Sequence, residues 1–226
     1  MNKALYGLRR SALYWFQTLV PVIKSLGFSP FGVDTCIFQN TKLNILILLY
    51  VDDMLVARAT NEKINNVMNL LGNHFEIKAI GEVKRFLGFD VIRDRKAKTI
   101  FLSQEAFTTA AIAKFGFAKH HAVKSPWPAR FELPKTWQPI NKKKYLKITR
   151  SLNWLATGTR LDIAYTVSRL CEANNRPSKK HMELVDHLFR YLVGTKSLGL
   201  VFGGNWQPKD LGLKAFADAS FADDLL

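Results

Sequence analysis

The sequence predicts an α+β fold, and two features of its hydrophobic pattern carry that prediction. Short β-favouring apolar runs at 43–51 and 54–57 flank the adjacent carboxylates Asp52 and Asp53, as expected for two strands of a hairpin. Longer segments at 4–26 and 178–193 repeat their apolar residues every three or four positions, which is the period of an amphipathic helix. With 226 residues and 48% hydrophobic content, the chain can form one generous domain or two small ones with real cores.

The charge balance indicates a polyanionic partner. Lys and Arg number 33 against 18 for Asp and Glu, a formal charge of +15, and such an excess suits nucleic acid or an anionic membrane surface. No apolar run reaches the roughly 18 residues that a spanning helix needs, and the sequence has no visible signal or lipidation motif. We therefore predict a nucleic-acid partner and no membrane.

The cysteines and histidines do not have the spacing that is typical of metal ligands. Cys36 and Cys171 are the two cysteines, and neither lies in a CxxC pair, which fits a reducing intracellular compartment, cytoplasmic particle or nucleus, without structural zinc. We expect all five histidines at the surface or its boundary, with no metal role. They are His74, His120, His121, His181 and His187.

The first half of the chain predicts helices and strands in turn. The helix at 4–26 ends at Gly27. Gly7, Arg9 and Arg10 lie at its start. They form either a solvated basic turn or a site where the glycine lets a flat ring approach the backbone. A strand follows at 34–39, and after the acidic pair comes a helix at 61–75. Two strands around a charged turn at 94–98 precede a helix at 105–115, which ends at Gly116.

The second half changes character at a segment rich in proline and lysine. Residues 118–144 hold four prolines and predict a linker or extended crossing segment. Its closing lysines, near Trp127 and Trp137, form either a solvated face or a groove that tracks a nucleic-acid backbone. We then expect a helix capped by Asp162, and another at 178–193, which together make a helical subdomain.

The acidic pair Asp52 and Asp53 is the strongest candidate for chemistry. Neighbouring carboxylates repel, and beside apolar strands they either acquire a raised pKa or bind a cation. The turn has no glycine, so turn chemistry alone does not explain the pair. Oxygen ligands suit Mg²⁺ or Mn²⁺, and two such ions can clamp the oxygens of a phosphoryl transfer. The alternative is a solvated acidic turn.

Three motifs, in this order and at these separations, resemble the palm of the reverse transcriptase of copia-type long-terminal-repeat retrotransposons. They are KALYGLRRSALYWF at 3–16, GFSPFGVDTCIF at 27–38 and LLYVDDMLVA at 48–57. The resemblance continues through Leu87 and Gly88, through Ser103 and Gln104, and through the segments 155–170, 181–195 and 198–202. The tail at 211–224 is similar to the first strand of a ribonuclease H domain, with Asp218 as a metal-binding carboxylate.

The resemblance implies an RNA-directed DNA polymerase that extends a primer on an RNA template or RNA/DNA hybrid with deoxynucleoside triphosphates. It implies that Asp52 and Asp53 hold Mg²⁺ or Mn²⁺ and that Tyr50 and Val51 back the primer end. It further implies a nucleotide site floored by Tyr6 and Gly7, with phosphates met by Arg9 and Arg10. The oligomeric state stays open.

The family also suggests a domain plan and a truncation. We predict a partial palm and thumb-like region at 1–117, a linker at 118–144, a helical connection region at 145–209 and the start of a ribonuclease H-like domain at 210–226. In the family the fingers, and a palm strand with a third catalytic aspartate, precede the KALYGL segment, so we expect this chain to be poorly active or inactive. The alternatives are a non-catalytic nucleic-acid-binding remnant and an unstable pseudogene product.

Smaller departures from the family occur at Ala12, Arg150 and Leu161. The family commonly has a small glycine where Arg150 stands, and an arginine there costs about 1 to 3 kcal/mol by overpacking if the site is buried.

Overall fold

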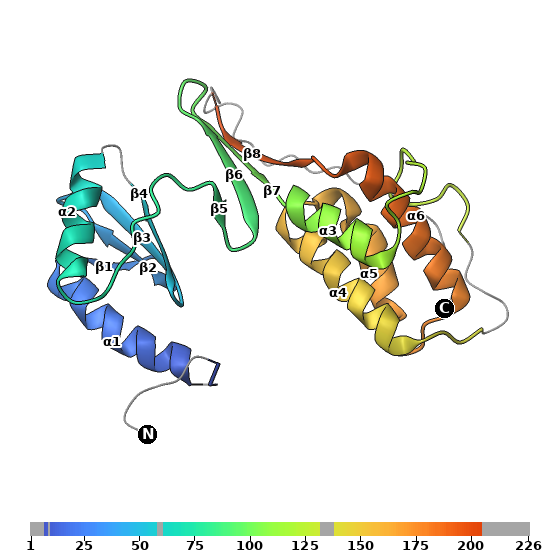
Figure 1. Cartoon of the computed structure of the whole chain (residues 1–226), viewed down its shortest axis with the longest axis horizontal. Coiled ribbons are helices and arrows are strands. Elements are labelled where there is room, and N and C mark those ends of the chain that lie inside the picture. Colours follow the sequence, from blue (N-terminus) through green and yellow to red (C-terminus); the bar gives the residue numbers. More distant parts are fainter. Residues whose placement is uncertain (1–6, 9, 58–60, 132–137, 205–226) are drawn as a thin grey trace. The chain divides into compact units, whose positions relative to one another are not determined.

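The structure is a computed structural model that describes residues 7–8, 10–57, 61–131 and 138–204, and its mixture of helices and sheets (Figure 1) confirms the α+β class. The chain divides into two compact units, Met1–Val83 and Lys84–Leu226. The boundary falls inside the predicted 1–117 region, because the strands and the helix after Val83 pack with the second unit.

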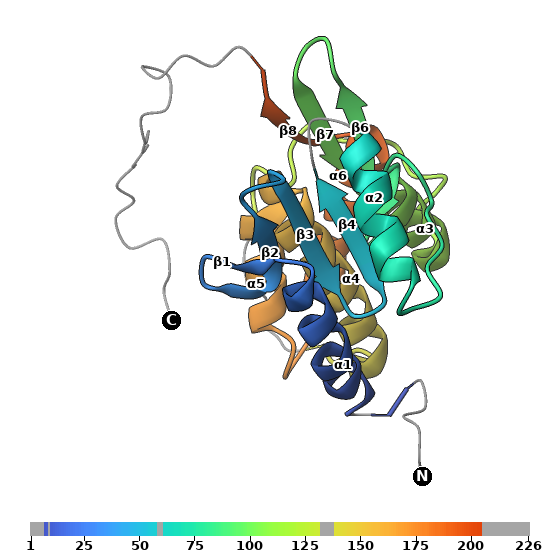
Figure 2. The ribbon, with the colours of Figure 1, turned by 90° about the vertical axis from the view of Figure 1, so that its left-hand side faces the viewer.

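The first unit is an antiparallel sheet with two helices packed against one face. The strands lie in the order β1(Ser29–Phe31), β2(Asp34–Asn40), β3(Ile45–Tyr50) and β4(Asp53–Ala57). Alternate residues of β3 are buried, and they share a core with α1(Ser11–Ser25) and α2(Asn61–Gly72). The core residues are Leu19, Ile23, Phe28, Phe38, Ile45, Ile47, Leu49, Val67 and Leu71. Figure 2 shows α1 and α2 in front of this sheet.

The first helix begins later than the sequence pattern predicts. It starts at Ser11, with Arg10 as the residue before its first turn, whereas the apolar period suggested a start near residue 4. Gly7 has a φ of +90°, which is incompatible with a right-handed helix, so the chain enters α1 through a turn. The predicted end is confirmed, since Gly27 has a φ of +83° and the Phe28 N–H donates to the Ile23 carbonyl.

The second unit combines another antiparallel sheet with a helical bundle. Its strands lie in the order β5(Arg85–Phe86), β6(Phe89–Asp94), β7(Thr99–Ser103) and β8(Gly199–Gly203). Strand β8 returns from the end of the bundle to pair with β7 (Figure 1). A Cβ at Gly199 would meet the Leu102 carbonyl and the Phe101 ring, so glycine permits this close pairing.

The bundle contains α3(Glu105–Phe115), α4(Lys142–Gly158), η1(Leu161–Ile163), α5(Ala164–Glu172) and α6(Lys179–Thr195). The prediction for α3 is confirmed at both ends, and Gly116 follows it with a φ of +91°. The pattern missed α4 as a helix, because its lysine-rich first turn was assigned to the linker. The Asn141 side chain caps α4 by accepting from the Lys144 N–H at 3.0 Å.

Much of the predicted linker is packed rather than free. Val123, Trp127 and Phe131 lie against the bundle core, and Pro139 forms an isolated β-bridge with Ser178 at the start of α6. Trp127 contacts Phe131 and Tyr165 through ring edges. Its prediction as part of a nucleic-acid groove therefore lacks support, and Trp137 lies outside the described residues.

Gln104 joins α3 to the end of α4. Its Oε1 accepts from the Thr159 N–H at 3.0 Å and the Thr159 hydroxyl at 3.1 Å, and its Nε2 donates to the Trp154 carbonyl at 3.2 Å. A Cβ at Gly158 would collide with the Gln104 amide. The contacts of Gln104 thus explain why a residue without a Cβ stands at position 158.

Asp162 does not cap a helix as predicted. Its carboxylate instead accepts from Arg160, a side chain that is 1% exposed, through Nε at 2.9 Å and Nη2 at 2.8 Å. The Tyr191 hydroxyl also donates to it, at 2.8 Å. Burial alone would raise the pKa of Asp162, but the hydrogen bonds from Arg160 and Tyr191 and the Arg160 charge lower this pKa below its ordinary value.

Two further sequence expectations need correction. His181 is buried, because it completes the N-terminal capping box of α6 with Ser178. Arg150 is exposed on α4, so the overpacking expected for a buried site does not arise. Within the described ranges, no helix combines the length and apolar character needed to cross a membrane.

Candidate functional site

The acidic pair lies at the turn between β3 and β4. Tyr50 pairs with Asp53 in the antiparallel register, so Val51 and Asp52 alone connect the two strands. The β-favouring sequence ILILLY extends the hairpin to the last residue before the turn. Tyr50, Val51 and both carboxylates are exposed, so the turn presents its acidic oxygens to solvent.

Val51 holds an unfavourable backbone conformation. Its φ is +51°, in the left-handed region where a β-branched residue is a rare outlier. Two-residue hairpin turns with a positive φ at the first central position favour glycine there. Holding valine in this state costs on the order of 1 to 3 kcal/mol, so surrounding contacts must stabilise the turn.

Trp15 of α1 supplies one such contact. Its indole N–H donates to the Val51 carbonyl at 2.8 Å, and its ring packs edge-on against Phe75, with centroids 5.2 Å apart. The sequence identified Trp15 only as part of the apolar face of a helix. No pattern links two residues that are 36 positions apart, so this contact comes from the tertiary structure alone.

The other predicted site residues are only partly described. Gly7 and Arg10 are exposed just before α1, and Arg10 precedes Trp15 by five residues. Tyr6, Arg9 and Asp218 lie outside the described residues. The structure therefore brings Tyr50, Val51, Asp52 and Asp53 together, and joins them to α1 through Trp15.

The donor set of the turn fits a hard divalent cation. Mg²⁺ is commonly bound through one or two carboxylates together with substrate phosphates, and Asp52 and Asp53 are adjacent, exposed carboxylates. The described ranges contain no cluster of three or more His, Cys, Asp or Glu side chains suited to a metal. Asp34 starts β2 toward the same end of the sheet, but its Oδ1 accepts from the Cys36 N–H at 2.8 Å.

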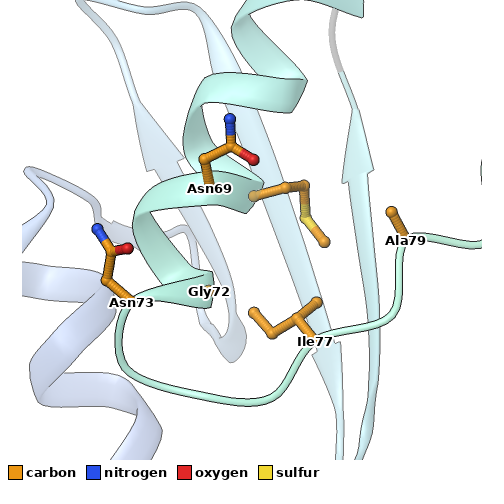
Figure 3. Close-up of a pocket in the computed structure, with 6 residues that line it drawn as sticks. Asn69, Gly72, Asn73, Ile77 and Ala79 are labelled. Atoms are coloured by element: carbon orange, nitrogen blue, oxygen red, sulfur yellow. The ribbon is translucent and has the colours of Figure 1, made fainter.

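A hollow of about 350 Å³ lies at the end of α2 (Figure 3). Its lining consists of Met68, Asn69, Gly72, Asn73, Ile77 and Ala79. The lining contains no titratable or nucleophilic side chain. We assign no chemistry to this hollow.

A row of cations follows one side of α4. Lys143, Lys147 and Arg150 recur at helical spacing and are exposed, and Trp154 continues the row with 42% exposure. The first turn of α4 holds no acidic residue. This set, called the α4 basic row below, combines charge with an aromatic ring, as sites for nucleic-acid strands do.

Comparison with known proteins gives consistent matches along the chain. The family model described as reverse transcriptase (RNA-dependent DNA polymerase) matches residues 1–129. The chain is 30% identical over its whole length to the retrovirus-related Pol polyprotein from transposon TNT 1-94 of Nicotiana tabacum, and covers 18% of that protein. It is 30% identical over 99% of its length to the corresponding polyprotein from transposon RE1 of Arabidopsis thaliana, and covers 15% of it.

A shorter relative is matched over most of its length. The putative transposon Ty5-1 protein of Saccharomyces cerevisiae is 29% identical over 96% of this chain, which covers 70% of that protein. The chain thus spans less than a fifth of the first two relatives. No solved structure matches it.

Proposed function

This chain belongs to the reverse transcriptase family, in the branch of copia-type retrotransposons, and from that premise we propose that it is a segment of an RNA-directed DNA polymerase. Such a polymerase joins deoxynucleotides to the 3′ hydroxyl of a primer on an RNA template, by in-line phosphoryl transfer. The hairpin turn that presents Asp52 and Asp53 together is the observation that carries the proposal.

In this proposal the two carboxylates hold Mg²⁺ or Mn²⁺ beside the reacting phosphate. The bound metal supplies charge neutralisation for the attacking and leaving oxygens. Asp52 and Asp53 orient it from one side, and the exposed Tyr50 and Val51 support the primer end. By the resemblance, Tyr6 with Gly7 floors the nucleotide and Arg9 with Arg10 binds phosphates.

The order of the strands leaves room for a further metal ligand beside β4. Strand β4 is at one end of the described order β1-β2-β3-β4, so the backbone on its outer side can pair with another strand. Asp53 is the first residue of β4. A strand that pairs there brings its own side chains beside Asp53, which is where a third aspartate of a polymerase palm would complete the metal site.

The remaining assignments follow the same premise. The first unit corresponds to part of the palm, and the helices of the second unit correspond to the thumb-like and connection regions. Asp218, which lies outside the described residues, corresponds by the resemblance to the first metal-binding carboxylate of a ribonuclease H domain, and in this proposal the protein acts inside the cell. These assignments rest on the family resemblance.

Primer extension tests the polymerase proposal. We expect any extension on an RNA template with Mg²⁺ or Mn²⁺ to be lost in Asp52→Asn, because one carboxylate cannot replace two. The matched control is Asp34→Asn, which removes an exposed carboxylate at the same end of the sheet and should leave extension unchanged. Measurable extension by the unmodified chain that persists undiminished in Asp52→Asn would refute the assigned role of the turn.

A second candidate function is template binding without catalysis, and the α4 basic row favours it. Each cation that neutralises a duplex phosphate adds about 0.9 to the slope of log affinity against log salt concentration. Replacing Lys143, Lys147 and Arg150 by serine should therefore reduce the slope by up to about 3 for an RNA/DNA duplex.

The matched control replaces exposed cations elsewhere, for which Lys24, Lys42 and Lys114 are suitable. The control removes the same charge but should leave most of the slope of log affinity against log salt concentration, because Lys24, Lys42 and Lys114 do not lie in one row. Equal loss of slope in the two triple variants would show that net charge alone governs binding. A chain that binds template without extending it would support this second function over the first.

A further inference from the structure

One contact of the turn that carries the acidic pair comes from a distant helix. Val51 has a positive φ without being glycine, and the carbonyl of this same residue accepts the indole N–H of Trp15 at 2.8 Å. The hydrogen bond thus acts on the peptide group that leads directly into Asp52.

From this geometry we propose that Trp15 is a positioning residue for the metal-holding turn. A tryptophan side chain has one polar atom, and that atom is a donor only. A donor fixed beside the Val51 carbonyl stabilises one orientation of the Val51–Asp52 peptide plane. The Asp52 carboxylate is attached to that plane, so Trp15 sets its direction without touching the metal. This inference deepens the proposed function and rests on it.

The indole itself is well anchored for this role. Its ring meets Phe75 edge-on at 5.2 Å, and α1 is held on the sheet by the buried Leu19 and Ile23. Phe75 follows α2, so α1 and the segment after α2 both restrain the ring. These contacts hold the Trp15 indole N–H beside the Val51 carbonyl, although the turn itself is exposed to solvent.

Two substitutions separate this role from simple packing. Trp15→Phe keeps an aromatic ring against Phe75 and removes the donor. Val51→Gly removes the need for the donor, because glycine adopts a positive φ without steric strain. If Trp15 acts through the turn, the double variant Trp15→Phe/Val51→Gly should recover the Mn²⁺ affinity that Trp15→Phe alone weakens. A loss of packing at Trp15 would not be restored.

The experiment uses the full ¹⁵N-labelled chain with Mn²⁺ as the probe. Paramagnetic broadening of the amide signals of residues 51–54 gives the Mn²⁺ affinity, and NMR coupling constants report φ at residue 51. We expect Trp15→Phe to weaken Mn²⁺ binding about 10-fold, as loss of a supporting contact around a metal site typically does. The coupling constants should then show averaging at Val51, and Trp15→Phe/Val51→Gly should recover most of the affinity.

The control is Trp127→Phe, since Trp127 packs in the second unit, and it should change neither measurement. Unchanged Mn²⁺ affinity and unchanged coupling constants in Trp15→Phe would overturn the inference, and so would a failure of Val51→Gly to rescue. If Mn²⁺ does not bind near the turn of the unmodified chain, the proposed function fails instead. The coupling constants at residue 51 still decide whether Trp15 sets the turn.

Discussion

Replacing Asp162 by asparagine tests how the second unit stabilises a buried cation. The Arg160 side chain is 1% exposed and that of Asp162 34% exposed, and two hydrogen bonds join them. Asparagine keeps the size of the side chain but removes its charge and one acceptor oxygen. The guanidinium then keeps its bonds to the Thr195 carbonyl and hydroxyl, at 2.9 and 2.8 Å, but loses its neutralising partner.

The expected cost follows from these contacts. Removing one partner of a fully buried ion pair costs about 3 to 5 kcal/mol, and a hydrogen bond to a charged group contributes about 1.5 to 3 kcal/mol. Because water reaches part of Asp162, we expect Asp162→Asn to lower the free energy of unfolding by about 2 to 3 kcal/mol. This is a large part of the stability of an ordinary domain.

Urea unfolding followed by far-ultraviolet circular dichroism measures this loss. The matched control is Glu183→Gln, which removes a carboxylate from an exposed ion pair with Lys180 at 2.7 Å. Exposed pairs contribute about 0.2 to 1 kcal/mol, so the control should lose much less stability. An equal loss in both variants would refute the reasoning about burial.

The same variant has a defined pH dependence. The pKa of Asp162 is lowered in the folded chain from an ordinary value of 3.8, so its contribution is present above that pH. The contribution is lost as the pH falls through the folded pKa. The difference in stability between the unmodified chain and Asp162→Asn should therefore shrink below about pH 4.

Two other substitutions test single contacts. Burial lowers the pKa of His181 from 6.5, and its Nδ1 accepts from the Ser178 N–H at 3.2 Å, so this stabilisation is present above about pH 6.5 and is lost as the pH falls through the folded pKa. His181→Gln, which supplies a common capping-box partner, should remove that pH dependence in thermal melts, and an unchanged dependence would contradict the assignment. Gly158→Ala should cost about 1 to 3 kcal/mol in urea unfolding, because the new methyl group displaces the hydrogen-bonded Gln104 amide. Gly72→Ala is the control, since a Cβ there meets nothing within 4 Å, and equal costs for the two would show that the contact at Gly158 is unimportant.

Local sequence patterns predicted much of the secondary structure. The helix at Glu105–Phe115 was predicted at both ends, and Gly116 supplies a left-handed stop directly after it. The helix at Lys142–Gly158 was missed, because a run of lysines beside prolines resembles a linker when its buried face is not known. The start of α1 was misplaced for a related reason, since apolar spacing continues through Gly7 although the backbone there is not helical.

The sequence alone determined the family and identified the acidic pair, because both depend on residues that are close together along the chain. Only the tertiary structure decided that Trp15 donates to the strained Val51 carbonyl, since hydrogen bonds across 36 residues leave no local pattern. It likewise replaced the predicted cap at Asp162 by an ion pair with the buried Arg160. An aspartate can either cap a helix or pair with an arginine, and the sequence does not distinguish the two roles. The packing of the folded chain decides which donor reaches the carboxylate.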